Sequence, residues 1–371
     1  QYVGARDAAG ASHSAGQGIL VSVLLSLAVA AALIVFPRQV FLLCYSKAEE
    51  AVVANAVTYL VPLSASLPAF AIYQAAFSIS RANGDNRFCL IIAVALNLLN
   101  LIAAYILIYV FDLGIFGSGL GYVISRTAAA AYCLYYLLKK GYLARLSHIF
   151  TVSFGYMWKI LKIGFIMGFE NMLFNFGKTL TTGVIVAAGT VHVAANTAVT
   201  SVFNVLTTPY VAGSTVSLTL VGRFIGADEK EEARSIAWKV FFFVFRWQAL
   251  MCLAVAPFSR QIIGFFAQNP DVINLSLVLL YMNLIAMPFF GPMVGPALQS
   301  LSGAGDNIFK AAVSVTSMWL LRIGLCYILA GGYFPIFEPI RGVIGVWIAQ
   351  TIDLFVKGGI MTARTYGRKW L

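Results

Sequence analysis

Long apolar runs separated by short polar segments fill almost the whole chain. Each run is long enough to cross the ~30 Å hydrocarbon core of a bilayer as a helix, which takes about 20 residues. None shows the alternation of apolar and polar residues over about ten positions that marks a strand of an outer-membrane barrel. The pattern predicts an all-α polytopic membrane helical bundle with ten helices present, in the ranges 18–43, 51–80, 88–110, 117–138, 156–189, 192–222, 230–258, 271–302, 308–330 and 342–364.

The second half of the chain repeats the first at a nearly constant offset. Gly-Asp-Asn stands at 84–86 and again at 305–307, and Gly-Ala stands at 4–5 and again at 226–227. We therefore predict two parallel six-helix repeats, of which the first is truncated to four helices. Because residues 156–222 have no counterpart in the first copy, we expect two further helices to precede the sequence given.

The boundary between the copies falls in a basic segment. We predict an N-terminal lobe at 1–138, a cytoplasmic linker at 139–155 and a C-terminal lobe at 156–371. A duplicated bundle of membrane helices indicates a transporter, because such repeats place a substrate site at their interface.

Composition and charge agree with a membrane protein. The chain is 60% hydrophobic and only 11% charged, whereas a soluble domain carries about 25% charged residues. The net charge of +11 comes from basic residues that gather in alternate gaps between the apolar runs, among them Lys139, Arg145, Lys310 and Arg368. This positive-inside distribution predicts that the linker and the C-terminus are cytoplasmic, and it disfavours nucleic acid as a partner.

Cysteine, histidine and glycine patterns offer no sign of an enzyme. The five cysteines stand singly, and none of the three histidines has a ligand partner at helical spacing. No Ser-His-Asp set, paired carboxylates or phosphate-cradling glycines stand out. We expect a protein that is not an enzyme and that has no resident cofactor.

Glu170 is the principal candidate for chemistry. It lies about 14 residues, or ~21 Å, into its helix, where an ionisable group costs about 2.5–3.5 kcal/mol. Its own helix offers no cation one turn away, and Lys178 is two turns away. Because burial favours the neutral carboxyl, Glu170 is suited to exchange H⁺ or Na⁺ for a substrate. The alternative is a protonated or cross-helix-paired Glu170 that only holds the bundle together.

Other polar residues extend the set of candidates. Asn171, Asn175 and Lys178 form a stripe on the same helix, where they either line a cavity or bind helices together. Asp353 and Lys357 stand four apart on the last helix and can neutralise each other.

Arginines inside the apolar runs are further candidates. Arg126 and Gln350 are repeat partners deep in equivalent helices, Arg246 and Arg322 are further buried cations, and we expect Arg126 to face the central cavity.

The range 271–302 contains Pro288, Pro292 and Pro296 on one face, with Asn283 and Gln299 as flanking polar candidates. Each proline removes a backbone hydrogen bond and bends the helix. This predicts a bent helix that lines the cavity and moves during transport, or else a static kink.

These features together resemble the multidrug and toxic compound extrusion (MATE) family. The resemblance lies in two six-helix halves, in the Gly-Ala and Gly-Asp turns after the second and fourth helix of each half, and in segment 163–174. That segment, IGFIMGFENMLF, is similar to the family's seventh helix, which carries a membrane-embedded Glu. One departure is that the range 271–302 has no acidic residue inside the membrane, where some members place an Asp.

The resemblance implies secondary active multidrug efflux by antiport with H⁺ or Na⁺ and alternating access between two lobes. It implies Glu170 as the cation-coupling residue, and as a metal ligand if Na⁺ is the coupling ion. The implied partners are small cationic or amphipathic organic substrates and the lipid bilayer. The implied protein is a multi-pass monomer of the cell inner membrane.

A flippase and a membrane transferase are the alternatives to an exporter. A flippase for lipid-linked saccharides can share a two-lobed helical plan, and several exposed arginines around Arg126 would favour it. A membrane transferase needs polar catalytic residues in a long loop, whereas every loop here is short.

Overall fold

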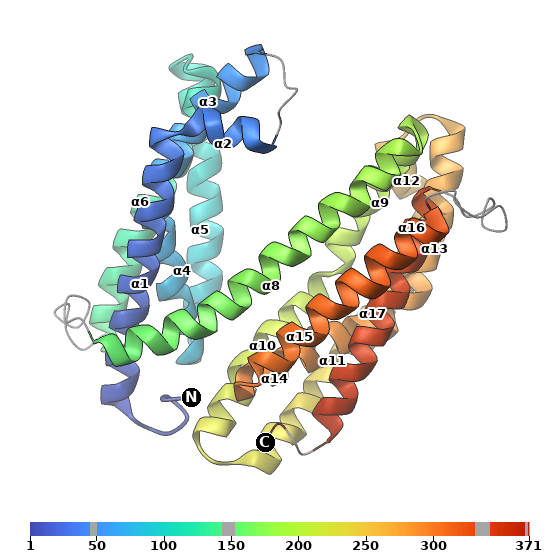
Figure 1. Ribbon diagram of the computed structural model, residues 1–371. Coiled ribbons are helices and arrows are strands. Elements are labelled where there is room, and N and C mark those ends of the chain that lie inside the picture. The colour runs from blue at the N-terminus through green and yellow to red at the C-terminus, as the bar shows by residue number, and fades with distance from the viewer. Residues whose placement is uncertain (45–49, 143–152, 331–341, 368–369, 371) are drawn as a thin grey trace. The chain divides into compact units, whose positions relative to one another are not determined.

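The computed structural model of the chain describes residues 1–44, 50–142, 153–330, 342–367 and 370 (Figure 1). Within these residues the regular structure is helical, and it contains no strand. The chain forms two compact units. One consists of Arg6–Lys162 with Tyr2, and the other of Ile163–Leu371 with Gln1 and Val3–Ala5. The predicted linker residue Arg145 lies outside the described residues.

The N-terminal unit begins with a long helix that ends at Val35, and its C-cap Phe36 stands directly before Pro37. Two of its helices meet at a bend of 48° between Ala65 and Leu67. Its core contains Tyr73, Ala76, Cys133 and Leu137. Its helices are α1 (Ala8–Val35), α2 (Pro37–Cys44), α3 (Glu50–Ala65), α4 (Leu67–Ala82), α5 (Asn86–Tyr105), the π-helical turn Ile106–Val110 and α6 (Gly114–Lys139).

The C-terminal unit begins within the long helix α8 and ends with α17. Leu279, Leu280, Met287 and Trp347 belong to its largest core cluster. Two π-helical segments, Met293–Ala297 and Ser317–Ile323, interrupt its helices. The helices are α8 (Phe154–Ala187), α9 (Thr190–Leu206), α10 (Thr208–Gly226), α11 (Lys230–Val255), α12 (Ser259–Phe266), α13 (Pro270–Pro292), α14 (Leu298–Ala304), α15 (Asn307–Thr316), α16 (Gly324–Ala330) and α17 (Val343–Tyr366).

The predicted helical bundle is confirmed, and each of the ten predicted ranges is occupied by helix. Among the described residues, six helical spans are long and apolar enough to cross a membrane, or eight if each of two bent pairs counts as one span. The other two predicted ranges correspond to α6 and α8, which are continuous helices of 26 and 34 residues.

The repeated Gly-Asp-Asn segments form the predicted turns that end one helix and cap the next. Gly84 and Gly305 adopt φ angles of +86° and +95°, a left-handed conformation that glycine adopts without steric cost. Asp85 accepts a hydrogen bond from the Phe88 backbone N–H and another from the Tyr136 hydroxyl on α6. Asp306 instead pairs with Arg364 on α17, at 3.0 Å. The first copy of the turn is thus held to α6 by a hydrogen bond, and the second copy is held to α17 by an ion pair.

The repeated Gly-Ala segments meet each other reciprocally. A Cβ on Gly4 would lie 1.9 Å from the Arg223 carbonyl oxygen, and one on Gly226 would lie 2.0 Å from the Gln1 carbonyl oxygen. Gln1 and Arg223 are related by the same offset as Gly4 and Gly226. Only glycine permits this approach at either position.

Candidate functional site

Glu170 forms a buried ion pair with Lys310. The Lys310 Nζ lies 3.3 Å from Glu170 Oε2, and the two side chains are only 4% and 14% exposed. The charge pattern counted Lys310 among the basic residues of a gap between apolar runs, whereas its side chain is buried against Glu170. Because α15 begins at Asn307, Lys310 lies within the helix and packs against α8. The partner that Glu170 lacks on its own helix is therefore supplied by α15.

Glu170 lies on the face of α8 that packs against α15 and the π-helical segment Ser317–Ile323. Glu170, Phe174 and Gly177 recur at spacings of four and three, which places them on one side of the helix. Gly177 is buried, and a Cβ there would lie 2.5 Å from the Met318 side chain. Its neighbour Phe176 packs on Trp319 at a ring distance of 6.0 Å. The small residue thus lets α8 approach the π-helical segment closely.

Cationic side chains gather around the Phe174 ring. The Lys357 and Lys178 ammonium groups lie 5.1 Å and 5.6 Å from the ring centroid, and the Arg322 guanidinium lies 5.7 Å from it. These distances fall within the range of cation–π attraction. Lys178 is exposed, whereas Lys357 and Arg322 are buried.

A second carboxylate, Asp353, is completely buried in the same unit. It accepts a hydrogen bond from the Ser317 hydroxyl, and its other oxygen has no hydrogen-bond partner among the described residues. Arg322 donates to the Gln350 side-chain oxygen at 2.6 Å. The predicted direct neutralisation of Asp353 by Lys357 is not found, because Ser317 binds the carboxylate while Lys357 lies over Phe174. Lys357, only 3% exposed, forms no ion pair with any described residue.

We call these residues the α8–α17 cluster. It combines two carboxylates with three buried cations, so its described members carry an excess of positive charge. The members are Glu170, Phe174, Lys310, Ser317, Arg322, Gln350, Asp353 and Lys357.

The predicted polar stripe on α8 does not join this cluster as a whole. Asn171 and Asn175 are exposed, and each side-chain amide donates to a backbone carbonyl of its own helix at 2.8 Å. Only Lys178 reaches the Phe174 ring. The role of the two asparagines as cavity-lining residues stays a prediction.

Arg126 lies in the N-terminal unit, in an aromatic setting. Its guanidinium donates to the Ser66 hydroxyl at 2.7 Å and lies 4.3 Å and 4.8 Å from the Phe70 and Tyr122 ring centroids. None of its described contacts is with another arginine. The arginine group that would favour a flippase is thus not found among these contacts.

The three prolines of the range 271–302 are all buried. The backbone changes from α-helical to π-helical directly after Pro292, so the predicted irregularity is present. Asn283 is buried and donates to the Leu279 carbonyl, and the half-buried Gln299 has an unpaired side-chain oxygen among the described residues. Whether this segment moves during transport stays a prediction.

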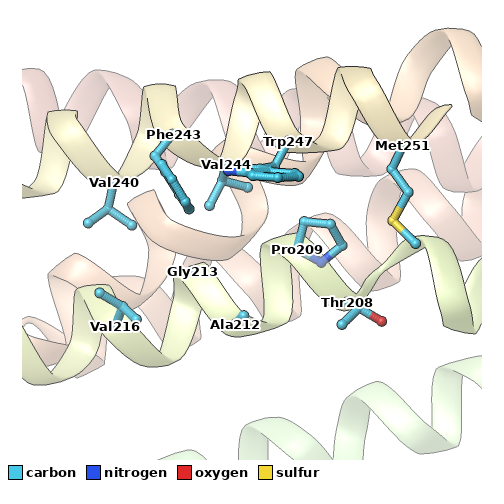
Figure 2. Close-up of a pocket in the computed structure, with 10 residues that line it drawn as sticks. All are labelled: Thr208, Pro209, Ala212, Gly213, Val216, Val240, Phe243, Val244, Trp247 and Met251. Carbon is cyan, nitrogen blue, oxygen red and sulfur yellow. The ribbon is translucent and has the colours of Figure 1, made fainter. Parts of the chain in front are cut away.

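A groove of about 370 Å³ separates parts of α10 and α11 (Figure 2). We call it the α10–α11 groove, and it is almost entirely apolar. The residues that line it are Thr208, Pro209, Ala212, Gly213, Val216, Val240, Phe243, Val244, Trp247 and Met251.

A second hollow of about 470 Å³ adjoins the first on α11, and we call it the basic hollow. It contains Arg246. The prediction that Arg246 is a buried cation is wrong, because its side chain is exposed. The residues that line it are Ser235, Trp238, Lys239, Phe242, Phe243 and Arg246.

Metal ligands do not gather in the described part of the chain. No group of three or more His, Cys, Asp and Glu side chains in it could hold a metal ion. A Na⁺ bound at Glu170 would therefore not be held by three such side chains among the described residues.

Apolar helices in a duplicated arrangement, with ionisable side chains buried among them, define a polytopic membrane transporter. The MatE sequence pattern matches residues 1–106 and 167–328, so the chain belongs to the MatE family of multidrug and toxic compound extrusion transporters.

Relatives in sequence are named as transporters. The uncharacterized transporter YisQ of Bacillus subtilis is 25% identical, over 100% of this chain and 81% of its own length. The probable multidrug resistance protein NorM of Thermotoga maritima is 22% identical, over 87% of this chain and 69% of its own length.

Solved structures share the fold. The Vibrio cholerae MATE transporter VcmN in the bent form has a TM-score of 0.81 at 20% identity, over 98% of this chain and 81% of that one. A MOP superfamily transporter from Pyrococcus furiosus, for which a binding pocket of reverse polarity is said to suggest a different function, has a TM-score of 0.85 at 18% identity. That match covers 98% of this chain and 80% of the other.

Proposed function

We propose that this protein is a secondary active exporter of small amphipathic organic molecules. It works by antiport with H⁺ or Na⁺ and by alternating access in the cell inner membrane. The buried Glu170–Lys310 pair is the observation that carries the proposal, because it sets a carboxylate among apolar helices with one ion-pair partner, Lys310, among the described residues. In this scheme Glu170 binds either Lys310 or the incoming ion.

Ion binding at Glu170 changes the electrostatics of the whole cluster. H⁺ or Na⁺ on the carboxylate removes the counter-charge of Lys310, which stays buried beside α8. Breaking a buried pair in this way costs about 3–5 kcal/mol. The excess of cations in the α8–α17 cluster adds to that cost, because Arg322 and Lys357 also lack a carboxylate within ion-pair distance among the described residues. A rearrangement of α8 against α15 relieves it and so links ion binding to conformation.

The test replaces the titratable carboxyl by an amide of the same shape. Cells that express the protein should accumulate less of at least one dye in a panel of cationic, neutral and anionic fluorescent dyes, and an ionophore should abolish the difference. Glu170→Gln should accumulate dye as empty-vector cells do at equal expression. Because this change leaves Lys310 buried without its partner, it is also tested together with Lys310→Met, which removes the unpaired charge, and the double variant should fail to export as well. Glu229→Gln, which alters an exposed carboxyl at the start of α11, should export like the wild type.

Two outcomes would contradict the proposal. Export by Glu170→Gln at the wild-type rate would make Glu170 structural and place coupling elsewhere. Equal accumulation of every dye by wild-type and empty-vector cells would argue against export itself and would favour the flippase, which should then be tested with lipid-linked saccharides.

A further inference from the structure

The exposed side of α11 joins an apolar groove to a pair of cations. We propose that this side binds one anionic phospholipid. One acyl chain occupies the α10–α11 groove, and the phosphate lies between Lys239 and Arg246 in the basic hollow. This lipid site is separate from the α8–α17 cluster and does not depend on the proposed transport cycle.

The α10–α11 groove suits hydrocarbon and little else. Phe243 and Trp247 project from α11 toward α10 and form one wall (Figure 2). A Cβ on Gly213 would lie 2.2 Å from Val244, so the two helices meet closely at the floor. The hydroxyl of Thr208 already donates to the Val205 carbonyl at 2.7 Å. The groove therefore has no free donor for a polar ligand at that position.

The basic hollow holds two exposed cations that have no counter-charge. Neither Lys239 nor Arg246 forms an ion pair or hydrogen bond with any residue that the structure describes, and no carboxylate lines the hollow. Arg246 lies eight positions, or ~12 Å, beyond Trp238 along α11, inside the candidate membrane span Lys230–Phe266. A cation that faces lipid at such depth is unfavourable unless an anion reaches it.

Helix geometry brings the two cations to one phosphate. Side chains on an α-helix lean toward its N-terminus, so Arg246 leans toward Lys239. The end of α11 toward which it leans also carries Trp238, an amphipathic ring of the kind that is enriched at membrane interfaces. A phosphate held there accepts hydrogen bonds from the planar guanidinium and from the ammonium group.

The two hollows adjoin at Phe243, and the part of the groove beyond it matches most of the length of one leaflet's acyl chain. Phe243 lines both of them. From Phe243 the α10–α11 groove continues along α11 to Met251, or ~12 Å at 1.5 Å per residue. Half of the hydrocarbon core is ~15 Å thick. A single lipid of the leaflet at which α11 begins thus fills the groove with its tail and the hollow with its headgroup. Two cations without a carboxylate favour a lipid of net negative charge.

Brominated lipids test both parts of the site. Bromine on an acyl chain quenches the fluorescence of an adjacent indole, and Trp247 lies in the groove. The purified protein is reconstituted into phosphatidylcholine vesicles with increasing amounts of brominated phosphatidylglycerol or brominated phosphatidylcholine. The Trp247 signal is the difference between the wild type and Trp247→Phe. We expect brominated phosphatidylglycerol to quench this signal at a severalfold lower mole fraction than brominated phosphatidylcholine.

Charge variants assign that preference to the basic hollow. Each basic residue near a membrane surface contributes about five-fold to the binding of an anionic lipid, so Lys239→Gln and Arg246→Gln together should abolish the preference. Arg260→Gln removes an exposed cation on α12, outside both hollows, and should preserve it. In the wild type, raising NaCl to 1 M should weaken the preference by screening, a readout that needs no variant.

Three results would overturn the proposal. The first is equal quenching of Trp247 by the two brominated lipids. The second is a phosphatidylglycerol preference that survives in the double Gln variant. The third is a preference that is insensitive to salt in the wild type. Because quenching is measured without any gradient or transport substrate, failure of export would leave this result unaffected.

Discussion

At the scale of single residues, the Glu170–Lys310 pair makes each charge depend on the other. Both side chains are nearly inaccessible to solvent, so the interaction is weakly screened. Removing one partner leaves the other as an uncompensated buried charge, whereas removing both leaves none. This asymmetry separates a buried pair from an exposed one such as Arg38–Glu50, whose side chains are 59% and 74% exposed.

Stability measurements on matched variants should reveal that asymmetry. Lys310→Met should destabilise the protein by about 3–5 kcal/mol, seen as a lower midpoint of thermal unfolding in detergent. The double variant Glu170→Gln with Lys310→Met should recover most of that loss. Arg38→Gln, at the exposed pair, should cost no more than about 1 kcal/mol. A double variant no more stable than Lys310→Met alone would show that the pair does not govern the buried charge balance.

The sequence predicts residue types at this site better than it predicts partners. Glu170 stood out because an acid in an apolar run is costly, and Lys310 carried the same signal, since it lies inside the range 308–330. Lys310 was nevertheless grouped with the basic residues of the gaps between helices, so it was not predicted as a buried partner of Glu170. The four-residue spacing of Asp353 and Lys357 permits an ion pair, but the conformations of the two side chains determine whether it forms. Here Asp353 accepts a hydrogen bond from Ser317, and Lys357 lies over the Phe174 ring.

At the scale of helices, proline position and hydroxyl side chains together explain the sharp bends. The bend of 45° between α9 and α10 lies at Thr207, just before Pro209. Thr207 and Thr208 donate to the Asn204 and Val205 carbonyls, and such back-bonding bends helices. The bend between α3 and α4 combines Ser66 with Pro68 in the same manner. Pro68 and Pro209 stand inside apolar runs that were predicted as single helices, and these bends were not predicted.

The reciprocal glycine contact predicts a specific pattern of variant effects. Gly226→Ala should destabilise the protein by about 1–3 kcal/mol, because its Cβ would meet the backbone of Gln1, which cannot move as a flexible side chain can. Gly4→Ala should have a similar effect, because it meets the backbone of Arg223. The double variant should cost less than the sum, since both changes disrupt one contact.

Thermal unfolding checks these values, with Gly18→Ala as the control. A Cβ at Gly18 meets no atom within 4 Å, so alanine there should be neutral or stabilising in helix α1. Strictly additive losses at Gly4 and Gly226 would show that the two positions act independently.

At the scale of the whole molecule, the sequence predicts the helices and their order, because the length and hydropathy of each apolar run are enough to identify it as a membrane-spanning helix. It also predicts the repeat, and the paired turns at Gly84 and Gly305 confirm its equivalent positions. What it does not predict is which helix faces meet, since that depends on shape and on side chains brought from distant segments. Parallel repeats are related by one rotation about the membrane normal, and that relation of the two halves stays a prediction.

Membrane orientation is the last prediction, and it follows from the alternating basic residues. The linker, the C-terminus and the turn at Glu229 should be cytoplasmic, whereas the turn at Gln268, at the other end of the α11–α12 span, should face outward. Both residues are exposed. In a background without native cysteines, an impermeant maleimide applied to intact cells should label Gln268→Cys and should miss Glu229→Cys until the cells are permeabilised. Labelling of Glu229→Cys in intact cells, with Gln268→Cys protected, would reverse the orientation. It would also move the proposed lipid to the outer leaflet, because the basic hollow lies toward the end at which α11 begins.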